Sequence, residues 1–228
     1  QNHLSREVNT AEIYDPGSDT WQLVGTMMVP RAFHTATLLT NGQVLVVGGS
    51  AYEPAPDGTQ LVDRGDTAEV FDPDTNAFYQ VGNLTYPRVY HDAVLLPDGK
   101  VLVAGGSHDE AVMSAEIFDP TTGSFATAPN LVFVREISNL ILLSDGNVIA
   151  IGTVTGSRAA ELYNPTSGSL KVIQEPRFFA YNFTATLLNN GKVLIAGGAT
   201  GFDGLARAEL YDPETESIVL VAPMNQSR

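Results

Sequence analysis

The sequence predicts an all-β protein of the β-propeller class, and two repeated patterns support this. An Ala-Glu pair followed by a β-branched or leucine residue and an aromatic residue begins at 11, 68, 115, 160 and 208. An Asn-Gly or Asp-Gly pair begins at 41, 98, 145 and 190. The first three spacings are 57, 47 and 45 residues for both patterns. A shared period of about 40–50 residues indicates that each repeat is one four-stranded blade.

The first two strands of each blade flank the Asn-Gly or Asp-Gly pair. Strand one is expected at 34–39, 91–96, 138–143 and 183–188, and strand two at 44–47, 101–104, 148–151 and 193–196. The pair between them predicts a type I′ hairpin turn, in which both residues have positive φ. Strand two is an almost continuous apolar run, which indicates burial on both faces.

The other two strands flank an Asp-Pro or Asn-Pro turn. Strand three contains the Ala-Glu pair and one aromatic residue in each copy: Tyr14, Phe71, Phe118, Tyr163 and Tyr211. Strand four contains an apolar residue seven positions later: Trp21, Phe78, Phe125, Leu170 and Ile218. These pairs predict a hairpin whose two apolar side chains meet.

The repeats divide the chain into one half-blade and four complete blades. The half-blade covers 1–24, and the blades cover 31–80, 88–127, 135–172 and 177–221 within a single domain. Open sheet edges favour aggregation, so a propeller must close. We therefore expect these residues to be part of a larger ring, with the remaining blades in the same or another chain.

Four features resemble the kelch repeat over nearly the whole chain. They are the Gly-Gly doublet at 48–49, 105–106 and 197–198, the strand-three aromatic residue, the aromatic or apolar residue seven positions later, and the Pro-Arg before strand one. The chain is most similar to the kelch repeats of secreted bacterial proteins and of the central domain of galactose oxidase. This resemblance implies a ring of six or seven blades and an extracellular or periplasmic location.

Composition limits the classes of partner. The formal net charge of −14 and the pI near 4.4 oppose nucleic acid or an anionic membrane as the main partner, since both bind basic surfaces. No apolar run approaches the ~20 residues of a transmembrane helix. The chain contains no cysteine, so it can form neither a disulfide nor a thiolate metal site.

The loops of one face of the propeller are the expected binding region. Loops two-to-three and four-to-one share a face because strands alternate in direction, and the two-to-three loops vary most: 50–67, 107–114, 154–159 and 199–207. Variable loops on a rigid scaffold commonly bind ligands. Tyr52 and His108 are candidate contacts in these loops.

Arginines just before strand one are a second set of candidates for this face: Arg31, Arg88, Arg135 and Arg177. A planar guanidinium suits a carboxylate or sulfate, so one interpretation is an anion or acidic-sugar site. The alternative is that each arginine pairs with the repeated strand-three glutamate: Glu12, Glu69, Glu116, Glu161 and Glu209. A buried carboxylate needs such a partner.

Two further candidates are aromatic. Tyr90 and His91, in the segment 88–91, resemble a Tyr-His pair that binds copper in galactose oxidase, although the cross-linking cysteine of that cofactor has no counterpart here. The alternative is that His34 and His91 are packing residues of the repeat. Tyr181 lies in the aromatic segment 175–183 and could stack on a sugar ring or pack in the core.

Three functions remain open. The leading hypothesis is a non-catalytic module that binds glycan or protein through the variable face, without a cofactor. The second is part of a galactose-oxidase-like copper-radical oxidase. The third is a structural or assembly protein whose ring is completed between chains.

Overall fold

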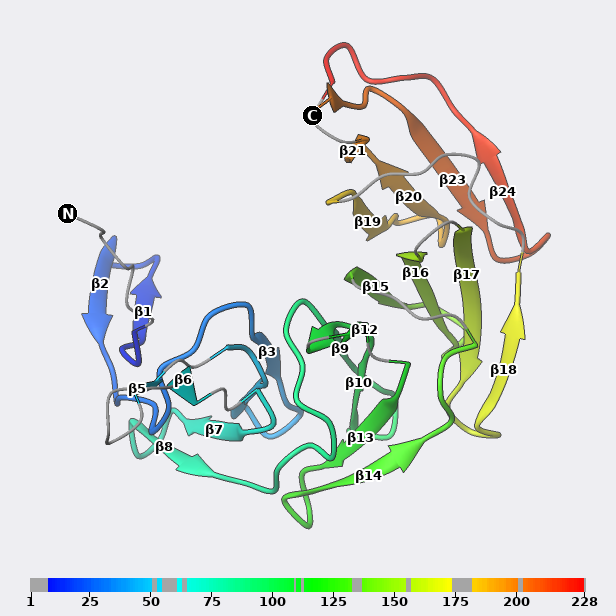
Figure 1. Cartoon of the computed structure of the whole chain (residues 1–228). Helices are drawn as coiled ribbons and strands as arrows, with labels where there is room; N and C mark the ends of the chain where they lie inside the picture. Colours follow the sequence, from blue (N-terminus) through cyan, green and yellow to red (C-terminus); the bar gives the residue numbers. More distant parts are fainter. Residues whose placement is uncertain are drawn as a thin grey trace.

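The computed structural model describes residues 8–50, 53–54, 61–62, 65–108, 110–111, 113–132, 137–154, 157–173, 182–200 and 203–227. Within these residues the protein contains strands and no α-helix, so no helix there could span a membrane. The sheets follow one another along an arc, with the innermost strands around a central space (Figure 1). These successive antiparallel sheets form a β-propeller, as the repeats predict.

The half-blade is a two-stranded sheet, and each complete blade is a four-stranded antiparallel sheet whose strands follow chain order from the inside outward. The half-blade contains β1 (Glu12–Asp15) and β2 (Thr20–Leu23). The first blade contains β3 (Thr35–Leu38), β4 (Val44–Val47), β7 (Ala68–Asp72) and β8 (Ala77–Gln80). The second contains β9 (Asp92–Leu95), β10 (Val101–Ala104), β13 (Ala115–Asp119) and β14 (Ser124–Ala128). The third contains β15 (Ile137–Leu142), β16 (Val148–Val154), β17 (Ser157–Asn164) and β18 (Ser169–Val172). The fourth contains β19 (Thr184–Leu187), β20 (Val193–Ala196), β23 (Ala208–Asp212) and β24 (Ser217–Leu220).

The turn between strands one and two differs from the type I′ prediction. Gly42 has a φ of 86°, but Asn41 is not among the residues with positive φ. The turn is closed by Leu39 N–H, which donates to the Gln43 carbonyl at 2.8 Å. The Asn41 side-chain oxygen accepts the Gln43 N–H at 3.1 Å, which explains the preference for Asn or Asp before the glycine. Only the glycine therefore needs the left-handed conformation.

The apolar core lies between neighbouring blades. Between the first two blades it contains Leu45 and Val47 of β4, which pack with Val101 and Val103 of β10; all four are fully buried. The aromatic pair Phe118–Phe125, with ring centroids 5.1 Å apart, belongs to the same cluster. Burial of strand two on both faces is thus confirmed for β10 of the second blade, which packs against the first and third blades and is buried at all four residues. In β20 of the fourth blade only Val193 and Ile195 are buried.

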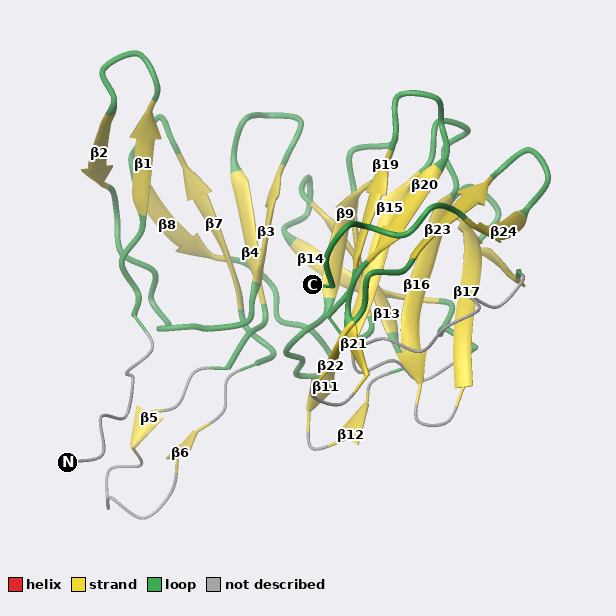
Figure 2. Cartoon of the chain, turned by 90° about the horizontal axis from the view of Figure 1, so that it is seen from above, coloured by secondary structure: helices red, strands yellow, loops and turns green. Residues whose placement is uncertain are grey.

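The two faces of the ring differ as the topology predicts. Figure 2 shows the short hairpin turns on one side and the two-to-three loops on the other. Three of these loops contain two-stranded ribbons that the sequence pattern did not indicate: β5 (Glu53–Pro54) with β6 (Leu61–Val62), β11 (Ser107–His108) with β12 (Glu110–Ala111), and β21 (Ala199–Thr200) with β22 (Asp203–Gly204). Each strand of these ribbons is only two residues long, which is too short for an alternation of apolar and polar residues to be recognised in the sequence.

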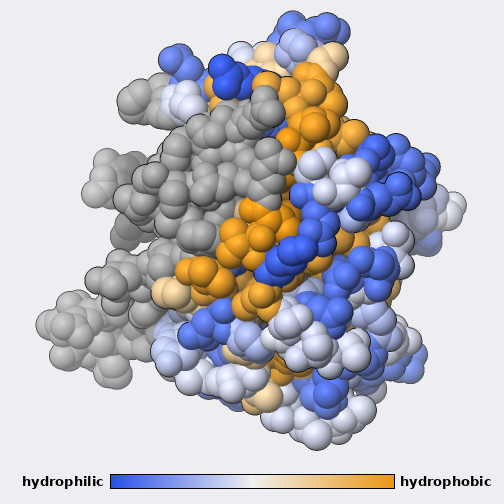
Figure 3. Space-filling view, turned by 90° about the vertical axis from the view of Figure 1, so that its right-hand side faces the viewer, coloured by the Kyte–Doolittle hydropathy of each residue, from blue (hydrophilic) through white to orange (hydrophobic). Residues whose placement is uncertain are grey.

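The outer strands leave apolar side chains on the surface. Val172 of β18 and Val219 and Leu220 of β24 are 44%, 46% and 51% exposed. Figure 3 shows apolar and hydrophilic residues mixed on the side of the molecule that carries these strands. Exposed apolar residues in a mixed surface are normal for a folded domain, so we assign no site to this side.

Candidate functional site

Two exposed aromatic rings meet just before the inner strands of the first and second blades. Phe33 precedes β3 and Tyr90 precedes β9, and they are 55% and 45% exposed. Their ring centroids lie 4.4 Å apart with planes tilted by 41°. The backbone N–H of Tyr90 also donates to the Phe33 carbonyl at 3.4 Å. We call these two residues the aromatic pair.

The backbone of the aromatic pair is strained. Phe33 and Tyr90 have φ values of 59° and 55°, in the left-handed region that bulky side chains rarely adopt. Each such residue costs roughly 1–3 kcal/mol, and such strain clusters at functional sites. Asn182, at the same place in the fourth blade, has a φ of 56°. The conformation therefore belongs to the repeat, while the exposed aromatic side chains belong to the first two blades.

The Gly-Gly doublet packs closely against the backbone of the residue that precedes Phe33 or Tyr90. In the first blade, Ala32 forms an antiparallel bridge with Ser50, and in the second blade Val89 does so with Ser107. A Cβ atom on Gly106 would lie 2.5 Å from the Val89 carbonyl oxygen, and Gly106 has a φ of 89°. Only glycine fits at such a contact, because the nearest atom is backbone.

His91 directly follows Tyr90 in the chain and lies in the seam between the first two blades. It is buried, and its Nε2 lies 3.1 Å from Thr35 Oγ1 of the first blade. Its ring packs on Gly48, where a Cβ atom would lie 2.7 Å from His91 Cε1. Burial, followed by the nearby charge of Arg88, lowers the pKa of His91 to about 3. His91 is therefore neutral at physiological pH, and its contacts fit the packing alternative.

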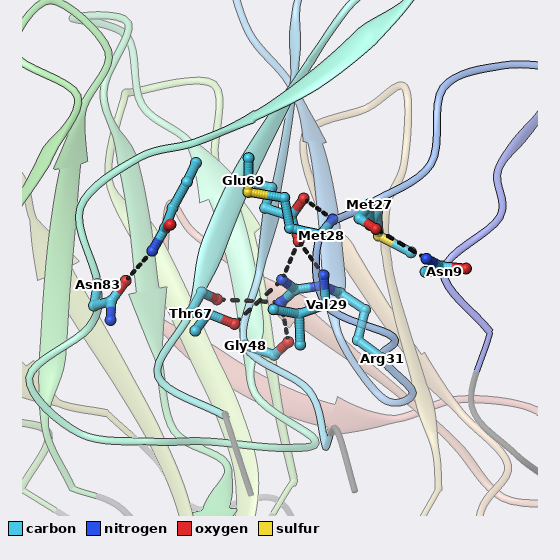
Figure 4. A network of polar contacts seen from close by, with 10 residues as sticks. Asn9, Met27, Met28, Val29, Arg31, Gly48, Thr67, Glu69 and Asn83 are labelled. Atoms are coloured by element: carbon cyan, nitrogen blue, oxygen red, sulfur yellow. Dashed lines mark hydrogen bonds and ion pairs between the residues drawn. The ribbon is translucent and has the colours of Figure 1, made fainter. Parts of the chain in front are cut away.

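Arg31 and Glu69 form a buried network that fixes the segment before β3 (Figure 4). Arg31 Nη2 lies 2.7 Å from Glu69 Oε1, and both side chains are only 1% exposed. The guanidinium also donates to the carbonyls of Gly48 and Thr67, at 2.6 and 3.2 Å. Glu69 in turn accepts the backbone N–H groups of Met28 and Val29, at 2.7 and 3.2 Å.

The second blade repeats this network. Arg88 Nη2 lies 3.0 Å from Glu116 Oε1, and Arg88 is fully buried. Its guanidinium donates to the Gly105 and Ser114 carbonyls at 3.0 and 2.9 Å. The N–H of Thr85 donates to Glu116 at 2.8 Å. The geometry of Arg31 and Arg88 favours the Arg–Glu alternative, and their role in ligand binding stays a prediction.

The structure describes no side chain for the remaining candidates in the variable loops and before the third and fourth blades. Tyr52, Arg135, Arg177 and Tyr181 lie outside the described residues. His108 is placed only as a backbone position in β11. For Tyr90, by contrast, the structure adds the partner that sequence reasoning missed, Phe33. The signal was present, since both copies have an aromatic residue directly before the histidine.

The described residues do not fit a copper centre. No group of three or more His, Asp or Glu side chains among them is placed to hold a metal ion. The Nε2 of His91 contacts Thr35, and the ring is enclosed in the seam between blades. We therefore assign no metal-dependent step to these residues.

Comparison with known proteins agrees with the repeat pattern. Over 78 residues, the chain is 36% identical to galactose oxidase of Gibberella zeae, a match that covers 33% of this chain and 11% of the relative. Over 87 residues, it is 33% identical to aldehyde oxidase GLOX1 of Arabidopsis thaliana, covering 36% of this chain and 14% of the relative. The chain is a kelch-type β-propeller similar to galactose oxidase. The similarity spans only a small part of these relatives' length.

A solved structure extends the comparison to nearly the whole fold. The "Structure of YjhT" superposes on 96% of this chain and 78% of that chain, with a TM-score of 0.73. Its sequence identity of 15% means that the likeness concerns the fold alone. No protein-family model matches the chain.

Proposed function

We propose that this propeller is a non-catalytic binding module, and that the aromatic pair contacts a glycan. The observation that carries this proposal is the placement of two touching aromatic rings, each about half exposed, on a strained backbone. Aromatic faces pack well against the apolar faces of sugar rings, and the tyrosine hydroxyl adds a polar contact. We further propose an extracellular location, which rests on the resemblance to secreted kelch proteins.

The test is a glycan-binding measurement with variants that keep the backbone conformation. Asn182 shows that asparagine occupies the left-handed position in the fourth blade. Tyr90→Asn and Phe33→Asn should therefore preserve the fold while removing one ring each. We would screen neutral and acidic oligosaccharides on an array and measure the best binder by calorimetry. Each variant should weaken binding by about tenfold or more, the magnitude expected when a stacked ring is removed.

A matched control separates this effect from general loss of surface aromatics. Tyr79 lies on the outer strand β8 and is 41% exposed, far from the inner strands in Figure 1. Tyr79→Thr should leave glycan binding unchanged. If no oligosaccharide binds, or if Tyr90→Asn binds as tightly as the wild type, the glycan proposal is wrong. A protein ligand lost with Tyr90→Asn would instead support the same face with a different partner.

A second candidate function, part of a copper-dependent oxidase, is favoured by the names of the relatives, galactose oxidase and aldehyde oxidase GLOX1. Copper content after reconstitution with Cu²⁺ tests it, together with oxidation of galactose in air. Stoichiometric copper that is lost in His91→Gln would support it. The absence of cysteine opposes a cysteine-linked tyrosine supplied by these residues.

A further inference from the structure

A polar pocket of about 640 Å³ lies between the second and third blades, on the side of the short hairpin turns (Figure 2). Three turns line it, with residues 97–98 between β9 and β10, 144–146 between β15 and β16, and 164–166 between β17 and β18. The aromatic pair precedes strand one, whereas this pocket lies where strand one ends, so the two are at opposite ends of the inner strands. The pocket is therefore distinct from the proposed glycan site.

The charged side chains of this pocket are both acidic. Asp98 of the second blade and Asp145 of the third blade are exposed, and none of the described residues that line the pocket is basic. Each carboxylate accepts one backbone N–H of its own turn, from Lys100 at 3.1 Å and from Asn147 at 2.9 Å. Further acceptor positions remain, since a carboxylate can accept about four hydrogen bonds. The lining is thus complementary to a positively charged ligand that donates hydrogen bonds.

In the second and fourth blades, a lysine bridges the two turns of the same blade. Lys100 Nζ lies 3.3 Å from Asp119 Oδ2, and Lys192 Nζ lies 2.7 Å from Asp212 Oδ2. Each lysine directly follows the glycine of the first turn, and each aspartate is the last residue of strand three. The repeat therefore has a place for an ammonium group between these two turns.

The third blade has asparagine at both positions of this ion pair, Asn147 and Asn164. Asn147 Nδ2 donates to Asp145 Oδ2 at 2.7 Å, and Asn164 Oδ1 accepts the N–H of Thr166 at 3.0 Å. These bonds stay within each turn, so among the described residues neither asparagine bridges the two turns, and the pocket lies between them. A ligand can therefore place an ammonium group here.

Tyr163 has a buried hydroxyl beside this pocket. It is 4% exposed and belongs to the same core cluster as Leu96, which directly precedes the lining residues 97–98. Burial, followed by the charge of Asp98, raises the pKa of Tyr163, so its hydroxyl lies toward Asp98. The described residues provide no hydrogen-bond partner for this hydroxyl, although a buried hydroxyl normally has one. A ligand N–H in the pocket would supply that partner.

We propose that this pocket binds an aliphatic primary ammonium group, carried by a small amine or by a lysine side chain of a partner protein. Asp98 and Asp145 would neutralise its charge, and the Tyr163 hydroxyl would accept one of its N–H groups. The rings of Pro97 and Pro165 would pack against its methylene groups. A divalent ion such as Ca²⁺ fits less well, because it takes about 6–8 oxygen ligands. This inference is independent of the glycan proposal, because the pocket lies on the other side of the propeller.

The test is a heteronuclear NMR titration of the 228-residue chain with pentylamine, which carries an ammonium group on an unbranched chain like that of lysine. Saturable shifts should appear at the amides of Gly146 and Thr166, which line the pocket. Pentanol, which lacks the charge, should not bind. Nα-acetyl-lysine methylamide identifies the source of the ammonium group. Binding as tight as that of pentylamine supports a lysine side chain, and weaker binding supports a small amine.

Two single substitutions in the pocket should weaken this binding. Asp98→Asn should weaken it by about tenfold, because it removes a hydrogen bond between charged groups. Tyr163→Phe should weaken it by about threefold, as for a neutral hydrogen-bond partner. This variant should keep the fold, because Phe118 occupies the same position in the second blade. As a control, Asp74→Asn makes the same change in net charge at an exposed position of the first blade and should leave pentylamine binding unaltered.

A double substitution, Asn147→Lys with Asn164→Asp, gives the third blade the ion pair of its neighbours. The new ammonium group should occupy the pocket and abolish pentylamine binding, while the circular dichroism spectrum stays that of the wild type. The proposal is overturned if pentylamine does not bind, if pentanol binds equally well, or if Asp98→Asn or the double variant binds pentylamine as tightly as the wild type. Displacement of pentylamine by Ca²⁺ at a far lower concentration would also overturn it, in favour of a metal site.

Discussion

The half-blade and the second blade contain nearly the same hairpin sequence in two different environments. Tyr14 and Trp21 pair across β1 and β2 with ring centroids 5.2 Å apart, as Phe118 and Phe125 pair across β13 and β14 at 5.1 Å. Yet Tyr14 and Trp21 are 43% and 67% exposed, while Phe118 is 1% exposed. The hairpin geometry is thus local, whereas its burial depends on the two inner strands and the adjacent blade.

The same contrast holds for the repeated glutamate. In the second blade Glu116 is buried and bound by Arg88, and in the half-blade Glu12 is exposed. Burying a carboxylate is unfavourable unless it is fully hydrogen-bonded. The glutamate can be buried in the complete blades because the segment before strand one supplies both the guanidinium and the N–H groups. We therefore expect the same substitution at Glu116 and at Glu12 to change the free energy of unfolding by different amounts.

The largest expected effect separates these two glutamates. Glu116→Gln should lower the free energy of unfolding by about 3–5 kcal/mol, because it leaves the buried guanidinium of Arg88 without a counter-charge. Glu12→Gln should change it by less than about 0.5 kcal/mol, as for other exposed positions. Denaturant titration followed by circular dichroism measures both. Equal effects at the two positions would contradict the assigned role of burial. Arg88→Ala should match Glu116→Gln in size.

The next effect concerns the close backbone contact that the Gly-Gly doublet makes within the second blade. Gly106→Ala should destabilise the protein by about 2–4 kcal/mol, since the new Cβ atom would lie 2.5 Å from the Val89 carbonyl oxygen at a φ of 89°. Gly42 has a similar φ of 86° with open space around it, so Gly42→Ala isolates the conformational cost of roughly 1 kcal/mol. Thermal melting of both variants provides the measurement. If they lose equal stability, close backbone contact is not the reason for the doublet.

Most of the fold could be predicted from the sequence because its signals are local and repeated. The Ala-Glu pair, the turn glycines and the apolar runs each lie within one blade. A pattern that would be ambiguous in a single copy can be interpreted because it recurs along the chain. The type I′ prediction was wrong because Asn41 can either adopt positive φ or accept the Gln43 N–H with its side chain, and the sequence does not distinguish these.

The candidate site was less predictable because it is assembled between blades. Phe33 and Tyr90 are 57 positions apart, and their contact depends on how two sheets pack. The burial of His91 depends on Thr35 and Gly48 of the neighbouring blade. The arginine–glutamate pairing was anticipated as an alternative because one of each occurs per repeat, but only the structure shows that both partners are buried.

A smaller effect is expected in the pH dependence of the free energy of unfolding, which tests the burial of His91 in the seam. The pKa of His91 falls to about 3 in the folded protein from an unfolded value of about 6.5. Below pH 6.5 the unfolded chain binds a proton that the folded protein does not. Stability is therefore full above this pH and declines as the pH falls, by about 2 kcal/mol between pH 6.5 and 5. Denaturant titrations of wild type and His91→Gln, compared at each pH, isolate this contribution.

The comparison with His91→Gln is needed because other groups titrate nearby. Burial raises the pKa of Asp92, which accepts the N–H of Leu140 from the third blade. Its effect on stability has the opposite sign, since the folded protein then holds the proton more tightly. The pH slope of His91→Gln should be shallower than that of the wild type. Identical slopes would mean that His91 is not buried in the neutral form.

The smallest effect is expected at the aromatic pair, where strain and contact oppose each other. Tyr90→Asn removes a ring contact worth about 0.5–1.5 kcal/mol and replaces a bulky left-handed residue with one that tolerates this conformation. The two terms nearly cancel, so the melting temperature should move by only a few degrees in either direction. Tyr90→Val loses the same ring contact, but valine does not relieve the backbone strain of the left-handed conformation. This variant should therefore be less stable than Tyr90→Asn by about 1 kcal/mol. Equal stability of these two variants would show that the left-handed backbone at residue 90 stores no strain, and strain would then not mark the aromatic pair as a functional site.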